Sequence, residues 1–203
     1  MSTEDYLKDI TEIKNMMNKS SRFFSLSGLS GILAGIYAII GAAIAYYLVS
    51  TSGRDYLILH SKIFNYILID LAAIAILSIV TAAILSNRKA RKNNETLWNG
   101  TSRRLLAAFL IPLITGGIYI LIKIYSNHYG HTGSLMLIFY GLALVNASKY
   151  TIGNVKYLGY VEIILGLACA IYPGFGFWFW VLGFGVMHII YGSMIYFQHD
   201  YSN

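Results

Sequence analysis

Six long apolar runs occupy most of this chain, and they limit the folds that are open to it. A helix needs about 20 mainly apolar residues to cross the hydrocarbon core of a bilayer. Most of the runs reach or approach that length. They predict an all-α, polytopic membrane helix bundle with six transmembrane helices, at about residues 24–49, 64–85, 105–125, 134–149, 157–172 and 177–197.

The composition excludes an ordinary water-soluble fold. Only 12% of the 203 residues are charged, whereas a soluble domain carries about 25%. Six helices with short connections use the whole length, so we expect a single membrane domain over residues 1–203. The one cysteine, Cys169, has no partner for an intramolecular disulfide.

The first 22 residues differ from the rest of the chain. They carry four acidic residues and lead into an apolar run too long for a cleavable signal, so we expect the first span to stay in the membrane. Tyr6, Ile10, Ile13 and Met17 recur at helical spacing. This pattern predicts an amphipathic helix on the cytoplasmic surface.

Lysine and arginine predict the orientation, because cytoplasmic loops retain positive charge. Four of the 15 precede the first span, six follow the second and two flank the connection after the fourth. All three segments lie on one side of a six-span bundle, so both termini should face the cytoplasm. The six residues after the second span form the predicted basic loop, which should contact anionic lipid headgroups and not nucleic acid: Arg88, Lys89, Arg91, Lys92, Arg103 and Arg104.

Small residues mark faces where helices pack closely, because packing rather than hydrophobicity drives helix association in lipid. Ser27, Gly31 and Gly35 share one face of the first span, which should be buried against another span or another subunit. Counting from the turn at residues 173–176 places Gly166 level with Gly183, which predicts a close contact between the last two spans.

Several stretches of the chain resemble a family of small bacterial multi-span membrane proteins to which no activity is assigned. The stretches are Ser25–Gly35 (SLSGLSGILAG), Phe139–Thr151 (FYGLALVNASKYT), Glu162–Leu167 (EIILGL) and Trp180–Gly192 (WVLGFGVMHIIYG). The resemblance implies a location in the bacterial inner membrane, and it implies no functional residues.

Polar residues inside predicted spans are the candidate functional site, because they are costly in lipid. Glu162 and His188 come within one residue of the same depth, roughly 18 Å below the outer turn, and we expect them to form a pair. Asn146, at roughly 20 Å, should join their layer, with Asp70 above it at roughly 9–13 Å. The layer is either a structural interhelical contact or an ion or proton site.

No motif for a metal, a cofactor or a catalytic triad stands out, which disfavours an enzyme. Pro112 followed by Gly116 and Gly117 should loosen the third span, as in some transport proteins. Two function classes follow. One is an accessory, sensory or scaffold membrane component, acting as a homo-oligomer or with an unknown membrane partner. The other is a small ion- or proton-coupled transporter, channel or permease subunit.

Overall fold

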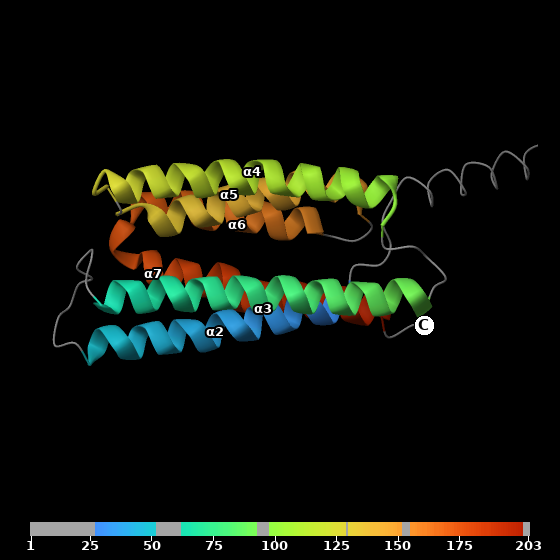
Figure 1. The fold of residues 1–203 in the computed structure, drawn as a ribbon, viewed down its shortest axis with the longest axis horizontal. Helices are drawn as coiled ribbons and strands as arrows, with labels where there is room; N and C mark the ends of the chain where they lie inside the picture. Colours follow the sequence, from blue (N-terminus) through green and yellow to red (C-terminus); the bar gives the residue numbers. More distant parts are fainter. Residues whose placement is uncertain (1–26, 52–61, 93–97, 129, 152–154, 201–203) are drawn as a thin grey trace, which may run out of the picture.

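The structure, a computed structural model, describes residues 27–51, 62–92, 98–128, 130–151 and 155–200, and every element within them is a helix (Figure 1). The amphipathic helix predicted within residues 1–22 lies outside the described residues. The helices are α2 (Gly28–Ser50), α3 (Lys62–Lys92), α4 (Gly100–Tyr125), α5 (Thr132–Ala147) with the 3-10 turn η1 (Ser148–Tyr150), and α6 (Val155–Ile171).

A last helical segment completes the fold. It follows the 3-10 turn η2 (Pro173–Phe175), and we call it the final helix: α7 (Gly176–Trp180), the π-helix η3 (Val181–Met187), α8 (His188–Ile195) and the π-helix η4 (Tyr196–Asp200). Four of the helical segments are long and apolar enough to cross a membrane: α2, α3, α4 and residues Pro173–Gln198. With 16 and 17 residues, α5 and α6 are shorter.

The helices α3 and α4 extend beyond their predicted limits. The helix α3 continues seven residues past Leu85, so Arg88, Lys89, Arg91 and Lys92 belong to its last turns and not to a loop. The helix α4 runs without interruption through Pro112. Asn99 begins α4, because its side-chain oxygen accepts a hydrogen bond from the Ser102 backbone N–H at 2.8 Å.

The helices form two groups that do not follow chain order (Figure 1). The consecutive helices α4, α5 and α6 pack together, while α2 packs between α3 and the final helix. The final helix also contacts α5 and α6, so it joins the two groups. The first and last described helices are therefore neighbours.

Glycines hold α2 against the final helix. A Cβ atom added to Gly35 would lie 2.6 Å from the Gly185 carbonyl oxygen, and one added to Gly31 would lie 3.1 Å from the Gly192 Cα. The two backbones come this close because each of these residues is a glycine, which has a hydrogen atom in place of a side chain. The small face predicted on the first span is thus buried within the chain, and Ser27 stands at its end as the N-cap residue of α2.

A second glycine contact joins α5 to α6. A Cβ on Gly141 would lie 2.6 Å from the Gly159 carbonyl oxygen, and one on Gly159 would lie 2.8 Å from the Gly141 oxygen. Gly166 also faces α5, where an added Cβ would lie 3.0 Å from the Ser134 carbonyl oxygen. The predicted contact of Gly166 with Gly183 is wrong, because these glycines lie on faces that pack against different neighbours.

Burial in this fold is the reverse of that in a water-soluble protein. The buried apolar residues are mainly alanines, whereas many large apolar side chains on α3 and α4 point outward, with Ile69 64% and Leu121 66% exposed. Glu162 and His188, in contrast, are buried. The outer faces of the bundle are therefore apolar and the interior holds small and polar groups.

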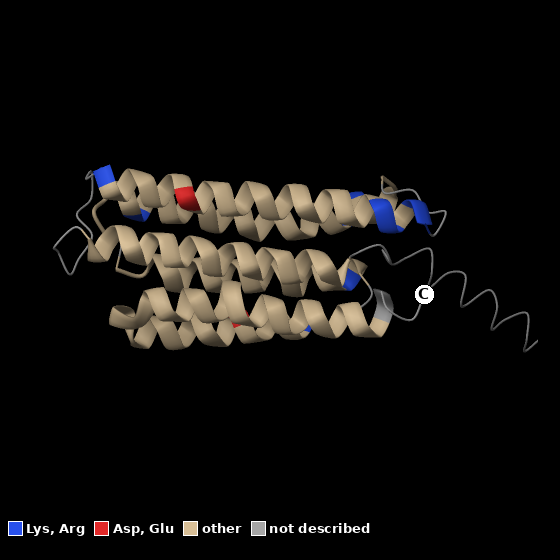
Figure 2. Cartoon of the chain, turned by 90° about the horizontal axis from the view of Figure 1, so that it is seen from below, with Lys and Arg blue, Asp and Glu red and all other residues tan. Residues whose placement is uncertain are grey.

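Positive charge gathers at one end of the bundle (Figure 2). Of the ten described lysines and arginines, eight lie where α3 ends, α4 begins, α5 ends and α6 begins, and the other two, Lys62 and Lys123, lie at the opposite end. The two ends of the helices thus differ in charge, although the connections themselves are only partly described.

The contact between α2 and the final helix makes a matched prediction for two glycines. Gly35→Ala should lower the free energy of unfolding by about 1–3 kcal/mol, because the new methyl group meets backbone atoms. Gly117→Ala should be neutral or raise it by up to about 1 kcal/mol, because nothing lies within 4 Å of the added Cβ. Thermal unfolding in detergent measures both, and equal stability of the two variants would contradict this contact.

Candidate functional site

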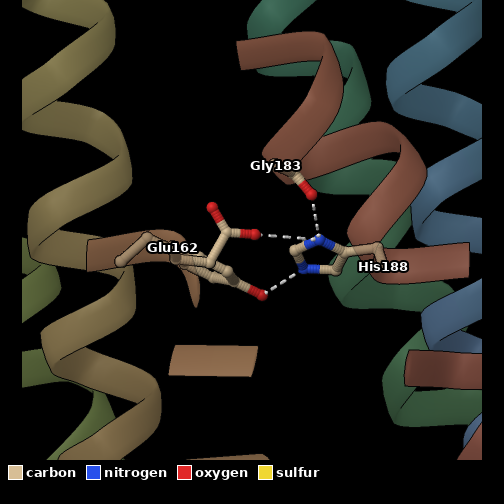
Figure 3. A network of polar contacts seen from close by, with 4 residues as sticks. Glu162, Gly183 and His188 are labelled. Atoms are coloured by element: carbon tan, nitrogen blue, oxygen red, sulfur yellow. Dashed lines mark hydrogen bonds and ion pairs between the residues drawn. The ribbon is translucent and has the colours of Figure 1, made fainter. Parts of the chain in front are cut away.

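Three polar side chains from three helical segments meet inside the bundle. They are Tyr140 from α5, Glu162 from α6, and His188, which follows the π-helix η3 in the final helix (Figure 3). Glu162 is fully buried and His188 is 6% exposed. We call these three residues the polar triad.

Both ring nitrogens of His188 have hydrogen-bond partners. Nδ1 lies 3.0 Å from the carbonyl oxygen of Gly183, and Nε2 lies 2.7 Å from the hydroxyl oxygen of Tyr140. A carbonyl oxygen only accepts hydrogen bonds, so Nδ1 carries a proton and donates. In a neutral ring Nε2 is then the acceptor, and the Tyr140 hydroxyl donates to it.

Glu162 is close to His188 but lacks a hydrogen-bond partner. Its Oε1 atom lies 3.5 Å from His188 Nδ1, which is within ion-pair distance. Neither of its buried carboxyl oxygens has a hydrogen-bond partner. The structure therefore brings the predicted pair together, yet the Nδ1–H group of His188 donates its hydrogen bond to the Gly183 carbonyl.

The backbone of the final helix shapes this site. Gly183 has no side chain, and a Cβ there would lie 2.5 Å from Glu162 Oε2, so the glycine makes room for the carboxyl group. His188 lies five residues after Gly183, directly after the π-helix η3, an element that often occurs at functional sites. Its ring points back toward Gly183, as side chains on helices do.

Aromatic rings enclose the triad. Phe184 stacks on His188 with ring centroids 5.9 Å apart, and its ring centroid lies 5.0 Å from that of Tyr140. Phe109 from α4 meets Tyr140 edge-on at 6.0 Å. The surroundings of the triad are thus apolar on several sides, which strengthens every electrostatic interaction inside it.

The depth estimate was right about the pair but wrong about the register. The Glu162 carboxyl group lies beside Gly183, five residues before His188, because a Cβ on Gly183 would lie 2.5 Å from Glu162 Oε2. The estimate counted residues 172–175 as helical rise, whereas the chain there crosses between helices through η2. His188 still meets Glu162, because its ring reaches back along the helix.

Asn146 does not belong to the triad. Gly141 lies between Gly159 and Ile163 of α6, which places Tyr140 level with Glu162, and Asn146 lies six residues, or about 9 Å, further along α5. Its amide nitrogen donates to the Ala108 carbonyl oxygen of α4 at 2.8 Å. Because Pro112 has no N–H to offer the carbonyl four residues before it, Asn146 satisfies the group that Pro112 leaves free.

Asp70 also lies away from the triad. A Cβ on Gly41 would lie 3.0 Å from Asp70 Oδ2, which places this carboxyl group between α2 and α3. The helix α3 packs mainly on α2. The prediction that Asn146 joins the layer of Glu162 and His188 is therefore wrong, and Asp70, which was expected above that layer, lies between α2 and α3.

Sequence reasoning missed Tyr140. Tyrosines are frequent in this chain, with 17 in all, so a single tyrosine within an apolar run carried no signal. The register of α5 on α6, which the Gly141–Gly159 contact sets, was the information that could have identified it.

Comparison with known proteins adds no further identification. No protein-family model matches this chain, and the comparisons with curated proteins and with solved structures gave no match either. The resemblance to small bacterial membrane proteins therefore stays a prediction.

The Asn146 contact predicts an interaction with Pro112 that a double-mutant cycle can measure. Asn146→Leu should lower the free energy of unfolding by about 1 kcal/mol, because the Ala108 carbonyl loses its donor. In a Pro112→Ala background the loss should be smaller, because the new N–H bonds the same carbonyl within α4. Equal losses in both backgrounds would show that Asn146 acts independently of Pro112.

Proposed function

We propose that this chain is an integral membrane protein whose six helical segments cross the bilayer. The observation that carries the proposal is the reversed burial, with large apolar side chains outside and small or polar groups inside. Such an apolar surface is more stable in contact with lipid, since its exposure to water would cost about 25 cal/mol per Å² of apolar area. Four helical segments have the length and composition of spans.

The two shorter helices fit this arrangement as inner spans. Together α5 and η1 extend over Thr132–Tyr150, and α6 has 17 residues, or about 25 Å of helix. That length is close to the hydrocarbon thickness of about 30 Å. Both helices pack against each other along most of their length and need less lipid-facing surface than α3 or α4.

The basic end of the bundle is the proposed cytoplasmic end. Positive charge is retained on that side of a membrane, and α3 and α4 both present it there, with Arg91, Lys92, Arg103 and Arg104 near the helix ends. The positive charge at this end would attract anionic lipid headgroups. The resemblance to bacterial proteins favours the inner membrane as the location.

Within the membrane we propose a non-catalytic role, as an accessory, sensory or scaffold component. The carboxyl group of Glu162 is closed to solvent, since this residue is fully buried. The other described helices leave much of α3 uncovered, because this helix packs mainly on α2. Such a component works through contacts with lipid, another copy or another membrane protein, and none of these requires a route for solutes.

A second candidate is a small proton- or ion-coupled transport protein. The observation that favours it is Glu162, a buried carboxyl group whose oxygens have no hydrogen-bond partner. A buried carboxylate without a donor is costly, and a group that costs stability is a reason to look for function. Transport requires a second conformation in which water reaches this carboxyl.

The proposed topology can be tested with cysteines at the two ends of α4. In a Cys169→Ser background, Ser126→Cys should react with an impermeant maleimide applied to intact cells. Gly100→Cys, equally exposed in the structure, should react only after the membrane is permeabilised. Lys149→Cys at the end of α5 should behave like Gly100→Cys, and labelling of it from outside would contradict the six-span arrangement.

Proton and cation flux in proteoliposomes separates the two candidate functions. For a non-catalytic component we expect the wild-type protein to add no flux over empty vesicles. A transporter should instead give a flux that Glu162→Gln and His188→Ala abolish and that Asp70→Asn, the matched carboxyl variant between α2 and α3, leaves unchanged. Circular dichroism and gel filtration establish that each variant is folded.

A further inference from the structure

The polar triad has too few donors for an ionised carboxyl group. His188 donates through Nδ1 to the Gly183 carbonyl at 3.0 Å, and the Tyr140 hydroxyl donates to Nε2. No N–H or O–H of the triad is then left for Glu162, whose buried oxygens have no hydrogen-bond partner. An ionised carboxylate in this position would lose its hydration without any replacement.

Other titratable and charged groups do not supply what is missing. Tyr140 is the titratable residue that α5 turns toward the pair. The helix α2 meets the final helix through glycines, and α4 approaches Tyr140 through Phe109. Among the described residues, His188 alone lies within ion-pair distance of Glu162. When His188 and Glu162 are both neutral, the site contains no charged group that lacks a hydrogen-bond donor.

We propose that Glu162 is a proton-binding site, and that loss of its proton moves the Nδ1–H hydrogen bond of His188 from the Gly183 carbonyl to the Glu162 carboxylate. Both acceptors already lie beside the same nitrogen, the carbonyl at 3.0 Å and the carboxyl Oε1 at 3.5 Å. A small shift of the ring or the carboxyl group exchanges them. The proton leaves Glu162 for water, the carboxylate gains one donor, and the ring keeps its own proton throughout.

Two residues position this exchange. The Tyr140 hydroxyl holds Nε2 as an acceptor, which keeps the ring proton on Nδ1 in both states. Gly183 contributes the competing carbonyl and, through its missing side chain, the space for the carboxyl group. The inference goes beyond the proposed function, because a proton-binding site serves a sensory component and a transporter alike, and it does not require flux.

Infrared spectroscopy of the full chain in lipid vesicles tests the proposal. At pH 7 exposed carboxyl groups are ionised, since their pKa values are about 4. The wild-type protein should therefore show the C=O stretch of a buried carboxylic acid. Glu162→Gln should remove this band and Asp70→Asn should retain it. On raising the pH, the band should disappear while a ¹⁵N signal of the histidine ring, absent in His188→Phe, shifts over the same range.

Two tyrosine variants distinguish a positioning role of Tyr140 in the proton exchange from a general structural effect of losing a hydroxyl group. Tyr140→Phe should change the pH at which the band disappears, because the ring proton is no longer held on Nδ1. Tyr37→Phe should leave that pH unchanged, because Tyr37 pairs with Thr81 between α2 and α3 at 3.3 Å. If Glu162→Gln does not fold, Glu162→Asp must shift the band in frequency or in its pH dependence.

Two results would overturn the proposal. One is the absence of any carboxylic acid band that depends on Glu162, which would make the pair an ion pair of carboxylate and protonated histidine. The other is a band that disappears without any change in the His188 signal. Neither result depends on whether the vesicles show flux, so the proposed function and the proton site fail or succeed separately.

Discussion

Contact between helix backbones at glycines is the interaction on which the rest of this structure depends. In the membrane that we propose for this chain, the apolar faces of helices gain little from meeting each other, so close packing and hydrogen bonds hold a bundle together. Gly35 and Gly185 bring α2 to the final helix, and Gly141 and Gly159 bring α5 to α6. The contact of Gly141 with Gly159 sets the register of α5 on α6, and Gly183 lets the final helix approach Glu162 of α6 and Leu137 of α5.

The polar triad is a consequence of that register and of a local departure from α-helical geometry. Glycine at position 183 lets the carboxyl group of Glu162 approach the final helix. His188 follows the π-helix η3 directly, and its ring points back at the carbonyl oxygen of Gly183. The same backbone segment thus admits the acid and competes with it for the histidine proton, which gives the site two arrangements of similar geometry.

Polar groups elsewhere in the bundle have a structural role that their residue types did not indicate. Asn146 resembled a member of an ion site in the sequence, yet it bonds the carbonyl that Pro112 leaves without a partner. This pairing also accounts for the uninterrupted course of α4 through a proline. A proline and an asparagine 34 residues apart are related only through the packing of α4 on α5, so no local pattern in the chain connects them.

The sequence by itself determined the helical class, the approximate helix positions, the end at which charge gathers, and the meeting of Glu162 with His188. Each of these follows from properties that act along one helix or across one short hairpin, namely hydrophobic length, charge at helix ends and residue counting from a turn. Only the tertiary structure decided that the final helix returns to α2, that Tyr140 completes the site, and that Asn146 and Asp70 lie apart from it. Those features depend on rotation and register between helices distant in the chain, which no pattern within a single helix determines.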